Sequence, residues 1–113
     1  MGASENPERY SNMAIRSLLR NGYSVKALGN KKGKVQNVIV ETEKLPFDDI
    51  DTITLYLGAK NQIPYYDYFL SLEPRRLIFN PGAENDELKI LAEKNQIVTE
   101  DACTLVLLSL NQY

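Results

Sequence analysis

The sequence predicts an α/β protein with a doubly wound, mostly parallel sheet and helices on both faces. Three observations lead to this fold class. Helix and strand patterns alternate along the chain, which is typical of parallel sheets covered on both sides. The small residues Gly2-Ala3-Ser4 lead into an amphipathic segment, a pattern that precedes anion-binding helices. Residues 52–57 are a run of β-branched and aromatic side chains, which indicates a strand.

The first half of the chain combines a helix with several strand patterns. Residues 11–20 place apolar side chains on a helical period, and Asn21-Gly22 ends this helix because glycine tolerates a left-handed conformation. Residues 23–28 are predicted as a strand. A loop rich in glycine and lysine follows at residues 29–34, and residues 38–40 form a short apolar segment.

The second half keeps the same alternation. Residues 61–72 favour a helix with Pro64 in its first turn, where the missing N–H does little harm. Residues 76–79 form a predicted strand that ends at the turn Asn80-Pro81-Gly82. A further helix begins at Asn85, a good N-cap residue. The last predicted elements are a short strand at residues 96–99 and a largely buried helix at residues 101–110.

Length and composition predict one globular domain spanning residues 1–113. The apolar fraction of 43% and the charged fraction of 25% are ordinary for such a domain. A net charge of −2 gives no reason to expect nucleic acid or an acidic membrane surface as a partner. No apolar run approaches the roughly 20 residues of a spanning helix, so no membrane partner is predicted.

Cysteine and histidine usage narrows the chemistry. Cys103 is the only cysteine, so no intrachain disulfide forms, which fits a cytoplasmic location. The chain contains no histidine. It therefore lacks the commonest general base and cannot build a Ser-His or Cys-His pair or most zinc sites by itself.

The loops at one edge of the sheet are the predicted site. Right-handed crossovers bring the carboxyl ends of parallel strands to one edge, where ligands bind in such folds. We therefore expect the loops at residues 2–11, 29–34 and 56–61 to meet there, with Asn80-Pro81-Gly82 as a fourth candidate.

The position of the first turn carries a second expectation. A phosphate-binding turn normally follows the first and central strand, whereas here only Met1 precedes Gly2. We expect this first strand to lie ahead of residue 1. Adding about six apolar residues before Met1 is predicted to raise the melting temperature, because strands of that length would supply missing ladder partners.

The residues that follow the strand predicted at 23–28 indicate which kind of nucleotide could bind. The dinucleotide fingerprint G-x-G-x-x-G is absent, and NAD-binding domains place an acid at the end of this strand. This chain has Gly29-Asn30-Lys31-Lys32 there instead. Lysine suits a ribose that bears a phosphate, as in NADP or coenzyme A. A solvated lysine loop that binds nothing fits the same spacing.

An ordered set of motifs along almost the whole chain resembles the CoA-binding domain family. These are small stand-alone Rossmann-like proteins similar to the N-terminal nucleotide domain of the succinyl-CoA synthetase alpha subunit. The resemblance implies a Rossmann-like domain that binds coenzyme A or an acyl-CoA and has no assigned reaction. The matching segments are Gly2-Ala3-Ser4 followed by Pro7, Arg9, Tyr10 and Ser11, then Asn21-Gly22-Tyr23, and residues 51–56, 78–82 and 102–105.

The same resemblance implies roles for five residues around the first turn. Gly2, Ala3 and Ser4 would hold the diphosphate through backbone N–H groups and a hydroxyl. Arg9 and Ser11 would add a charge and a hydrogen bond nearby.

Further roles are implied for the other loops. Asn30 and Lys31 would face the adenosine end, with the lysine near the 3′-phosphate. Tyr56 and Leu57 would flank the adenine or the start of the pantetheine. The turn Asn80, Pro81 and Gly82 would lie at the far side of the cleft.

Several other side chains favour structural roles. Cys103 lies in an apolar run with no histidine to activate it, so we expect it to be inert. A cluster of aromatic residues is expected to pack in the core. A cluster of acidic residues is expected to begin a helix, and no metal site is predicted there. These clusters are Tyr65, Tyr66, Tyr68 and Phe69, and Glu84, Asp86 and Glu87; Arg75 and Arg76 are expected to start a strand at the surface.

The sequence therefore predicts a coenzyme A-binding protein without catalytic residues. One alternative is an enzyme, either an NADP-dependent reductase with Tyr56 as proton donor or a subunit of an acyl-CoA ligase that takes its histidine from another chain. Another is an interaction domain without a ligand. A homodimer or an unknown protein partner is compatible with each of these hypotheses.

Overall fold

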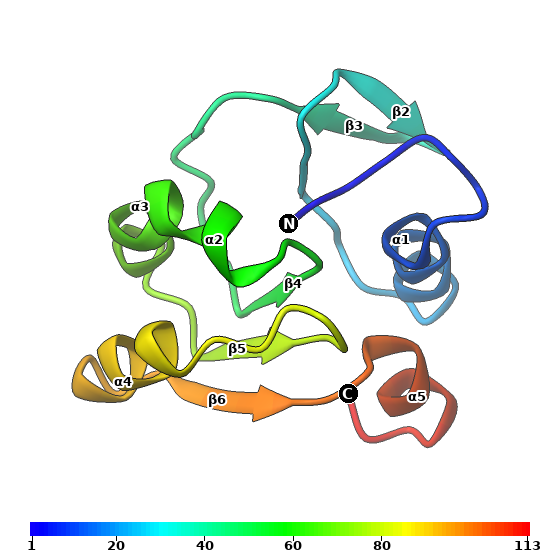
Figure 1. Ribbon diagram of the computed structural model, residues 1–113. Coiled ribbons are helices and arrows are strands. Elements are labelled where there is room, and N and C mark those ends of the chain that lie inside the picture. Colours follow the sequence, from blue (N-terminus) through cyan, green and yellow to red (C-terminus); the bar gives the residue numbers. More distant parts are fainter. The chain divides into compact units, whose positions relative to one another are not determined.

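The computed structural model describes residues 1–113, which form two compact units. Unit 1 comprises Met1–Lys44 and Thr104–Tyr113, and unit 2 comprises Leu45–Cys103. Figure 1 labels the elements along the chain. In order they are α1 (Tyr10–Arg20), β1 (Ala27–Leu28), β2 (Gly33–Val35), β3 (Val38–Glu41), β4 (Thr52–Leu55), α2 (Ala59–Gln62), the 3-10 turn η1 (Ile63–Tyr65), α3 (Tyr66–Ser71), β5 (Arg76–Phe79), α4 (Asp86–Lys94), β6 (Val98–Asp101) and α5 (Thr104–Ser109).

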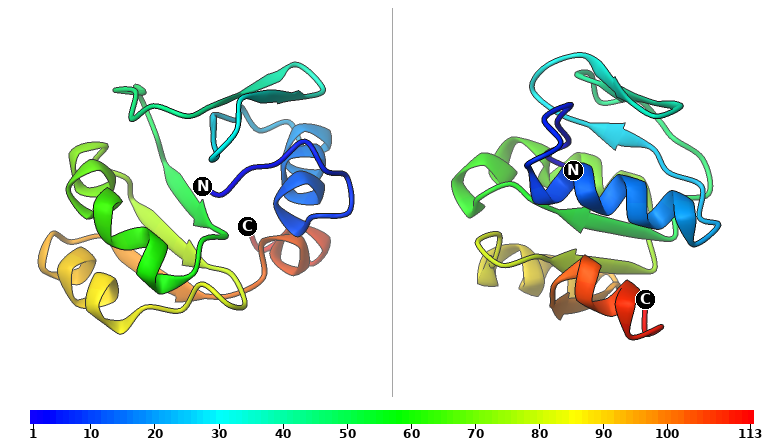
Figure 2. Two further views of the ribbon diagram at one scale, coloured as in Figure 1. Left: turned by 45° about the horizontal axis from the view of Figure 1, so that its top comes forward. Right: turned by 90° about the vertical axis from the view of Figure 1, so that its right-hand side faces the viewer.

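Unit 1 contains a three-stranded sheet in the order β1-β3-β2. β1 pairs with β3 in parallel, whereas β2 pairs with β3 antiparallel. Helices α1 and α5 belong to this unit and lie side by side, as both views in Figure 2 show. The apolar core of the sheet and α1 consists of Ala3, Ile15, Ala27, Val35, Val38 and Val40.

The hairpin between β2 and β3 differs from the predicted long loop. The loop after β1 ends sooner than expected, because Gly33 and Lys34 are already part of β2. Gln36 and Asn37 connect the two strands, and Gln36 adopts a left-handed φ of 54°. The prediction failed here because this tight turn has no glycine to mark it.

Unit 2 contains a parallel sheet in the order β4-β5-β6, as expected for a doubly wound fold. In β4, Ile53 and Leu55 are buried while the alternating threonines are half-buried, so one face of this strand is more apolar than the other. Right-handed crossovers place α2, α3 and α4 on one side of this sheet, as Figures 1 and 2 show. The parallel strands and helices confirm the predicted α/β, Rossmann-like fold class.

Two of the predicted helices differ from the structure. The single helix expected at residues 61–72 is three short pieces, α2, η1 and α3, because Pro64 has no N–H to continue the helical ladder. The helix expected to be largely buried, α5, buries only Thr104 and Leu108, while Val106 is 51% exposed. Leu110, which follows the helix, is 59% exposed. That prediction was wrong because a helix can bury one face and leave apolar residues on the other.

Candidate functional site

The N-terminus of α1 has the electrostatics of an anion-binding helix end. Arg9 occupies the N-cap position in an extended conformation, and no side chain caps the helix. The first intrahelical bond runs from the Met13 N–H to the Arg9 carbonyl, so the N–H groups of Tyr10, Ser11 and Asn12 precede the ladder. The first turn also lacks acidic residues, which would otherwise compete with an anion.

The turn Gly2-Ala3-Ser4 lies against the end of β1. The N–H groups of Gly2 and Ala3 both donate to the Leu28 carbonyl oxygen, at 2.9 and 2.8 Å, and Gly2 has a φ of 89° that favours glycine. The Ser4 hydroxyl oxygen accepts from the Asn6 N–H at 3.1 Å, which leaves its own hydrogen as a donor. In this conformation the hydroxyl of Ser4 is better placed to donate to an anion than the first two amides.

Two side chains of α1 hold this loop and were missed in the sequence. Asn12 donates from Nδ2 to the Ser4 carbonyl oxygen at 3.0 Å, and Arg16 donates from Nε to Asn12 Oδ1 at 2.8 Å. Arg16 also donates from Nη2 to the Pro7 carbonyl oxygen at 3.3 Å. The one available signal was the position of Asn12, one helical turn before the apolar Ile15 and therefore beside the buried stripe.

The lysine-rich turn after β1 approaches the same loop. A Cβ atom at Gly29 would overlap the Ala3 carbonyl oxygen, so only glycine allows this approach. The Glu5 carboxylate accepts from the Lys34 N–H at 2.9 Å and packs over Gly33. Loops 2–11 and 29–34 therefore meet, as predicted.

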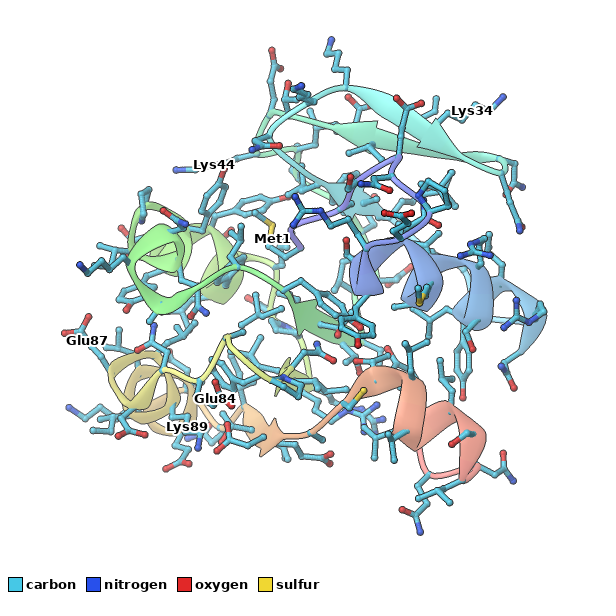
Figure 3. All side chains as sticks on the ribbon, turned by 45° about the vertical axis from the view of Figure 1, so that its right-hand side comes forward. Met1, Lys34, Lys44, Glu84, Glu87 and Lys89 are labelled. Carbon is cyan, nitrogen blue, oxygen red and sulfur yellow. The ribbon has the colours of Figure 1, made fainter.

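The cationic side chains of this turn are open to solvent. Asn30, Lys31 and Lys32 are exposed, and Figure 3 shows the exposed Lys34 side chain directed outward from the hairpin. Arg9 is exposed as well, whereas Ser11 is buried at 7% exposure. Arg9 and Ser11 therefore lie within loop 2–11, and Asn30 and Lys31 lie in the turn that meets this loop.

In unit 2 the turn after β5 is fixed from within. Asn80 is 1% exposed and donates from Nδ2 to Thr54 Oγ1 at 2.6 Å and to the Leu55 carbonyl at 3.0 Å. Gly82 has a φ of 94°, and its N–H donates to the Glu84 carboxylate at 2.8 Å. The amide hydrogens of Asn80 therefore serve the fold, while Pro81 and Gly82 are exposed.

A buried amide pair joins the two loops of unit 2. Gln62 is completely buried and donates from Nε2 to the carbonyl oxygens of Leu57 and Ala83, both at 2.8 Å. Its Oε1 accepts from Asn85 Nδ2 at 2.9 Å. Loop 56–61, with half-buried Tyr56 and Leu57, and the turn 80–82 are thus tied together as predicted, through a residue that the sequence did not single out.

The cap of α4 and the phenol beside it extend this network. Asn85 accepts from the Leu88 N–H at 3.2 Å, which confirms it as the N-cap, and its Nδ2 also donates to the Tyr66 hydroxyl at 2.9 Å. Burial is the main reason why the pKa of the Tyr66 phenol is raised. The network therefore holds α3 and α4 in register with both loops.

The remaining candidates have structural partners. Tyr65 stacks on Phe69 with ring centroids 5.9 Å apart, and burial raises the pKa of Tyr68, whose hydroxyl donates to the Leu45 carbonyl. Arg76 begins β5, as predicted, and Cys103 is half-buried. No three His, Cys, Asp or Glu side chains are grouped to hold a metal ion. None of the helices is both long enough and apolar enough to cross a lipid bilayer.

The fold and the loop before α1 define an α/β protein with a turn of small residues ahead of an uncapped helix N-terminus. The chain belongs to the CoA binding domain family, whose sequence profile matches residues 1–109. A comparison with curated proteins found no match.

Solved structures give the same fold. An uncharacterised protein is 39% identical, with a TM-score of 0.97 over 99% of this chain and 93% of that one. A hypothetical protein from Pyrococcus horikoshii OT3 is 23% identical, with a TM-score of 0.83 over 93% of this chain and 75% of that one. A Thermus thermophilus protein, cell-free ID.343, is 17% identical, with a TM-score of 0.87 over 100% of this chain and 87% of that one.

Proposed function

We propose that this chain binds coenzyme A or an acyl-CoA and does not catalyse a reaction by itself. The observation that carries the proposal is the uncapped N-terminus of α1, which lies directly after a loop held in place by Asn12, in a chain of the CoA binding domain family. Free N–H groups and the helix dipole both favour a diphosphate at this position.

The turn after β1 supports coenzyme A rather than NAD. No carboxylate lies between Arg9 and Glu41 in the sequence, so no acid directly follows β1, where NAD-binding domains place the one that binds the ribose hydroxyls. The Glu5 carboxylate that reaches this turn accepts from the Lys34 N–H. Exposed Lys31 lies close to Gly29, which touches the loop that would hold the diphosphate. A cation in this turn suits the 3′-phosphate of coenzyme A, because a charged donor strengthens a hydrogen bond to phosphate.

The roles of the unit 2 residues are part of the same proposal. Tyr56 and Leu57 would contact the adenine or the start of the pantetheine, and Pro81 and Gly82 would present backbone to the ligand. Asn80 would act by fixing this turn, because its Nδ2 hydrogens bond to Thr54 and Leu55.

The lack of a catalytic constellation supports a binding role. The chain has no histidine, and the half-buried Cys103 has no histidine base to form its thiolate.

Isothermal titration calorimetry with coenzyme A, acetyl-CoA, dephospho-CoA, NADP and NAD tests the proposal. We expect coenzyme A to bind more tightly than dephospho-CoA and both to bind more tightly than NAD. Lys31→Ala should lower the affinity for coenzyme A roughly tenfold and leave the affinity for dephospho-CoA almost unchanged, as expected for the loss of one charge-assisted hydrogen bond.

Lys26→Ala, an exposed lysine before β1, is the control for the loss of one positive charge. Equal weakening of coenzyme A and dephospho-CoA by Lys31→Ala would contradict the 3′-phosphate assignment. Tighter binding of NADP than of coenzyme A would favour a reductase, and no binding at all would favour an interaction domain.

A further inference from the structure

The pair Asn12 and Arg16 occupies an unusual place for polar residues on α1. Asn12 is only 4% exposed, and a buried primary amide is stable only when both of its ends are hydrogen-bonded. Its Nδ2 donates to the Ser4 carbonyl and its Oδ1 accepts from Arg16. Arg16 therefore fixes which way the Asn12 amide points.

Arg16 contacts the loop a second time. Its Nη2 donates to the Pro7 carbonyl oxygen at 3.3 Å while its Nε donates to Asn12. Only a guanidinium offers several donors in a fixed planar arrangement. The Arg16 side chain therefore holds the Asn12 amide and, at the same time, the Pro7 carbonyl of the loop. The carbonyls of Ser4 and Pro7 are thereby both turned toward α1.

The turned carbonyls determine where the following N–H groups point. In a planar trans peptide the N–H is directed opposite to the C=O. Because the Ser4 carbonyl faces Asn12, the Glu5 N–H faces away from Asn12. The hydrogen bond from Asn12 thus sets the direction of a backbone donor beside the N-terminus of α1.

We propose that Asn12 and Arg16 are positioning residues for diphosphate binding, which orient the Ser4–Glu5 peptide so that its N–H donates to the ligand. This inference rests on the proposed function. It assigns the two side chains a role through the loop rather than through contact with the nucleotide. Both are distinct from the residues that the sequence motifs pointed to.

The test compares two substitutions of the same residue. Arg16→Met removes both donors at similar length, and Arg16→Lys keeps the charge but cannot reproduce the fork. We expect both variants to bind coenzyme A and dephospho-CoA about tenfold more weakly than the parent chain. The factor should be the same for the two ligands, since both contain the diphosphate. Arg20→Met is the matched control, an exposed arginine in the last turn of α1, and should bind both ligands as the parent chain does.

A second readout separates orientation from stability. In the parent chain, the Glu5 amide resonance in a 1H–15N NMR spectrum should shift when coenzyme A is added, and this shift should be lost in both Arg16 variants although they remain folded.

Each of the following outcomes overturns the inference. Arg16→Lys binding like the parent would show that only charge matters. Unequal weakening of the two ligands would place Arg16 at the 3′-phosphate. A ligand-induced shift of the Glu5 amide resonance that persists in the variants would show that Asn12 and Arg16 do not orient the Ser4–Glu5 peptide. If the parent chain binds neither ligand, the proposed function fails and this inference fails with it. If the parent chain binds both ligands and the Arg16 variants bind them with the same affinity, only the inference is refuted.

Discussion

The loops of the two units are held in place by different means. In unit 1 the loop before α1 depends on the Asn12 and Arg16 pair and on the exposed Glu5, which bonds to the edge strand β2. In unit 2 the loops after β4 and β5 depend on Gln62 and Asn80, which are 0% and 1% exposed.

This difference separates a loop that has exposed as well as buried anchors from turns that are anchored by buried amide side chains. Hydrogen bonds at exposed positions exchange readily with water and contribute little net free energy, whereas a buried amide whose partner is removed costs its full desolvation penalty. We therefore expect the exposed Glu5 contact of the unit 1 loop to adjust when a ligand binds, and the bond from buried Asn12 and the turns of unit 2 to keep their conformation.

Gln62→Leu should give the largest effect. Leucine fills similar space but leaves the carbonyls of Leu57 and Ala83 without their donor, so we expect a loss of about 3 kcal/mol in the free energy of unfolding. Urea denaturation followed by circular dichroism measures it. Asn61→Leu, at the exposed neighbouring position, is the control and should change stability by less than about 0.5 kcal/mol. Equal values for the two variants would remove the contrast between the units.

Gly29→Ala should rank second. The new Cβ would overlap the Ala3 carbonyl oxygen, a backbone atom that cannot move without displacing the loop, and we expect a loss of about 2 kcal/mol together with weaker binding of coenzyme A. Thermal denaturation and calorimetry report both quantities. Gly58→Ala is the matched control, since no atom lies within 4 Å of its Cβ and its φ of −63° suits alanine. An unchanged Gly29→Ala variant would show that the loop yields to the extra atom.

Glu5→Ala should cost less, about 1 kcal/mol or below, because it removes one exposed hydrogen bond to the Lys34 N–H. Hydrogen exchange of the Lys34 amide should accelerate. Glu8→Ala, an exposed acid in the same loop, serves as the control. A loss as large as that of Gln62→Leu would mean that the loop of unit 1 is as firmly anchored as the turns of unit 2.

Asp51→Asn should have the smallest effect and marks a region of unit 2 outside the loops. The Thr52 hydroxyl, followed by the Arg75 guanidinium at 2.7 Å, holds the pKa of Asp51 below its usual value of 3.8. A lowered carboxyl pKa gives stability that is present above pH 3.8 and is lost as the pH falls through the lowered value. Both side chains are more than half exposed, so the contribution is no more than about 0.5 kcal/mol.

Melting temperatures between pH 2 and pH 6 provide the measurement, and Asp48→Asn is the control. The Asp51→Asn variant should lose slightly less stability than the parent on acidification. Identical acid profiles for the parent and Asp51→Asn would show that this exposed pair contributes nothing.

The sequence predicted those elements whose signals are local. Strand β5 was predicted to the residue, because Leu77, Ile78 and Phe79 form an apolar run that stops at Asn80-Pro81-Gly82. The N-cap at Asn85 followed from its side-chain chemistry and its position before two acids.

The contacts that hold the loops could not be predicted in this way. The bonds from Gln62 to Ala83 and from Asn85 to Gln62 join residues 21 and 23 positions apart. A glutamine within a helical pattern looks the same whether it is buried or solvated, and only the fold brings its partners to it. Asn12 and Arg16 lie one turn apart, but their common target, the loop before α1, has no pattern that reveals its path.

The hydrogen bond between Glu5 and β2 also affects how the protein behaves at high concentration. β2 is an edge strand, so its outward N–H groups are a template on which another chain could add a strand. The Glu5 carboxylate covers one of these donors, at Lys34, and brings a negative charge to the edge. We therefore expect the side chain that restrains the loop also to protect the sheet of unit 1 against edge-to-edge aggregation.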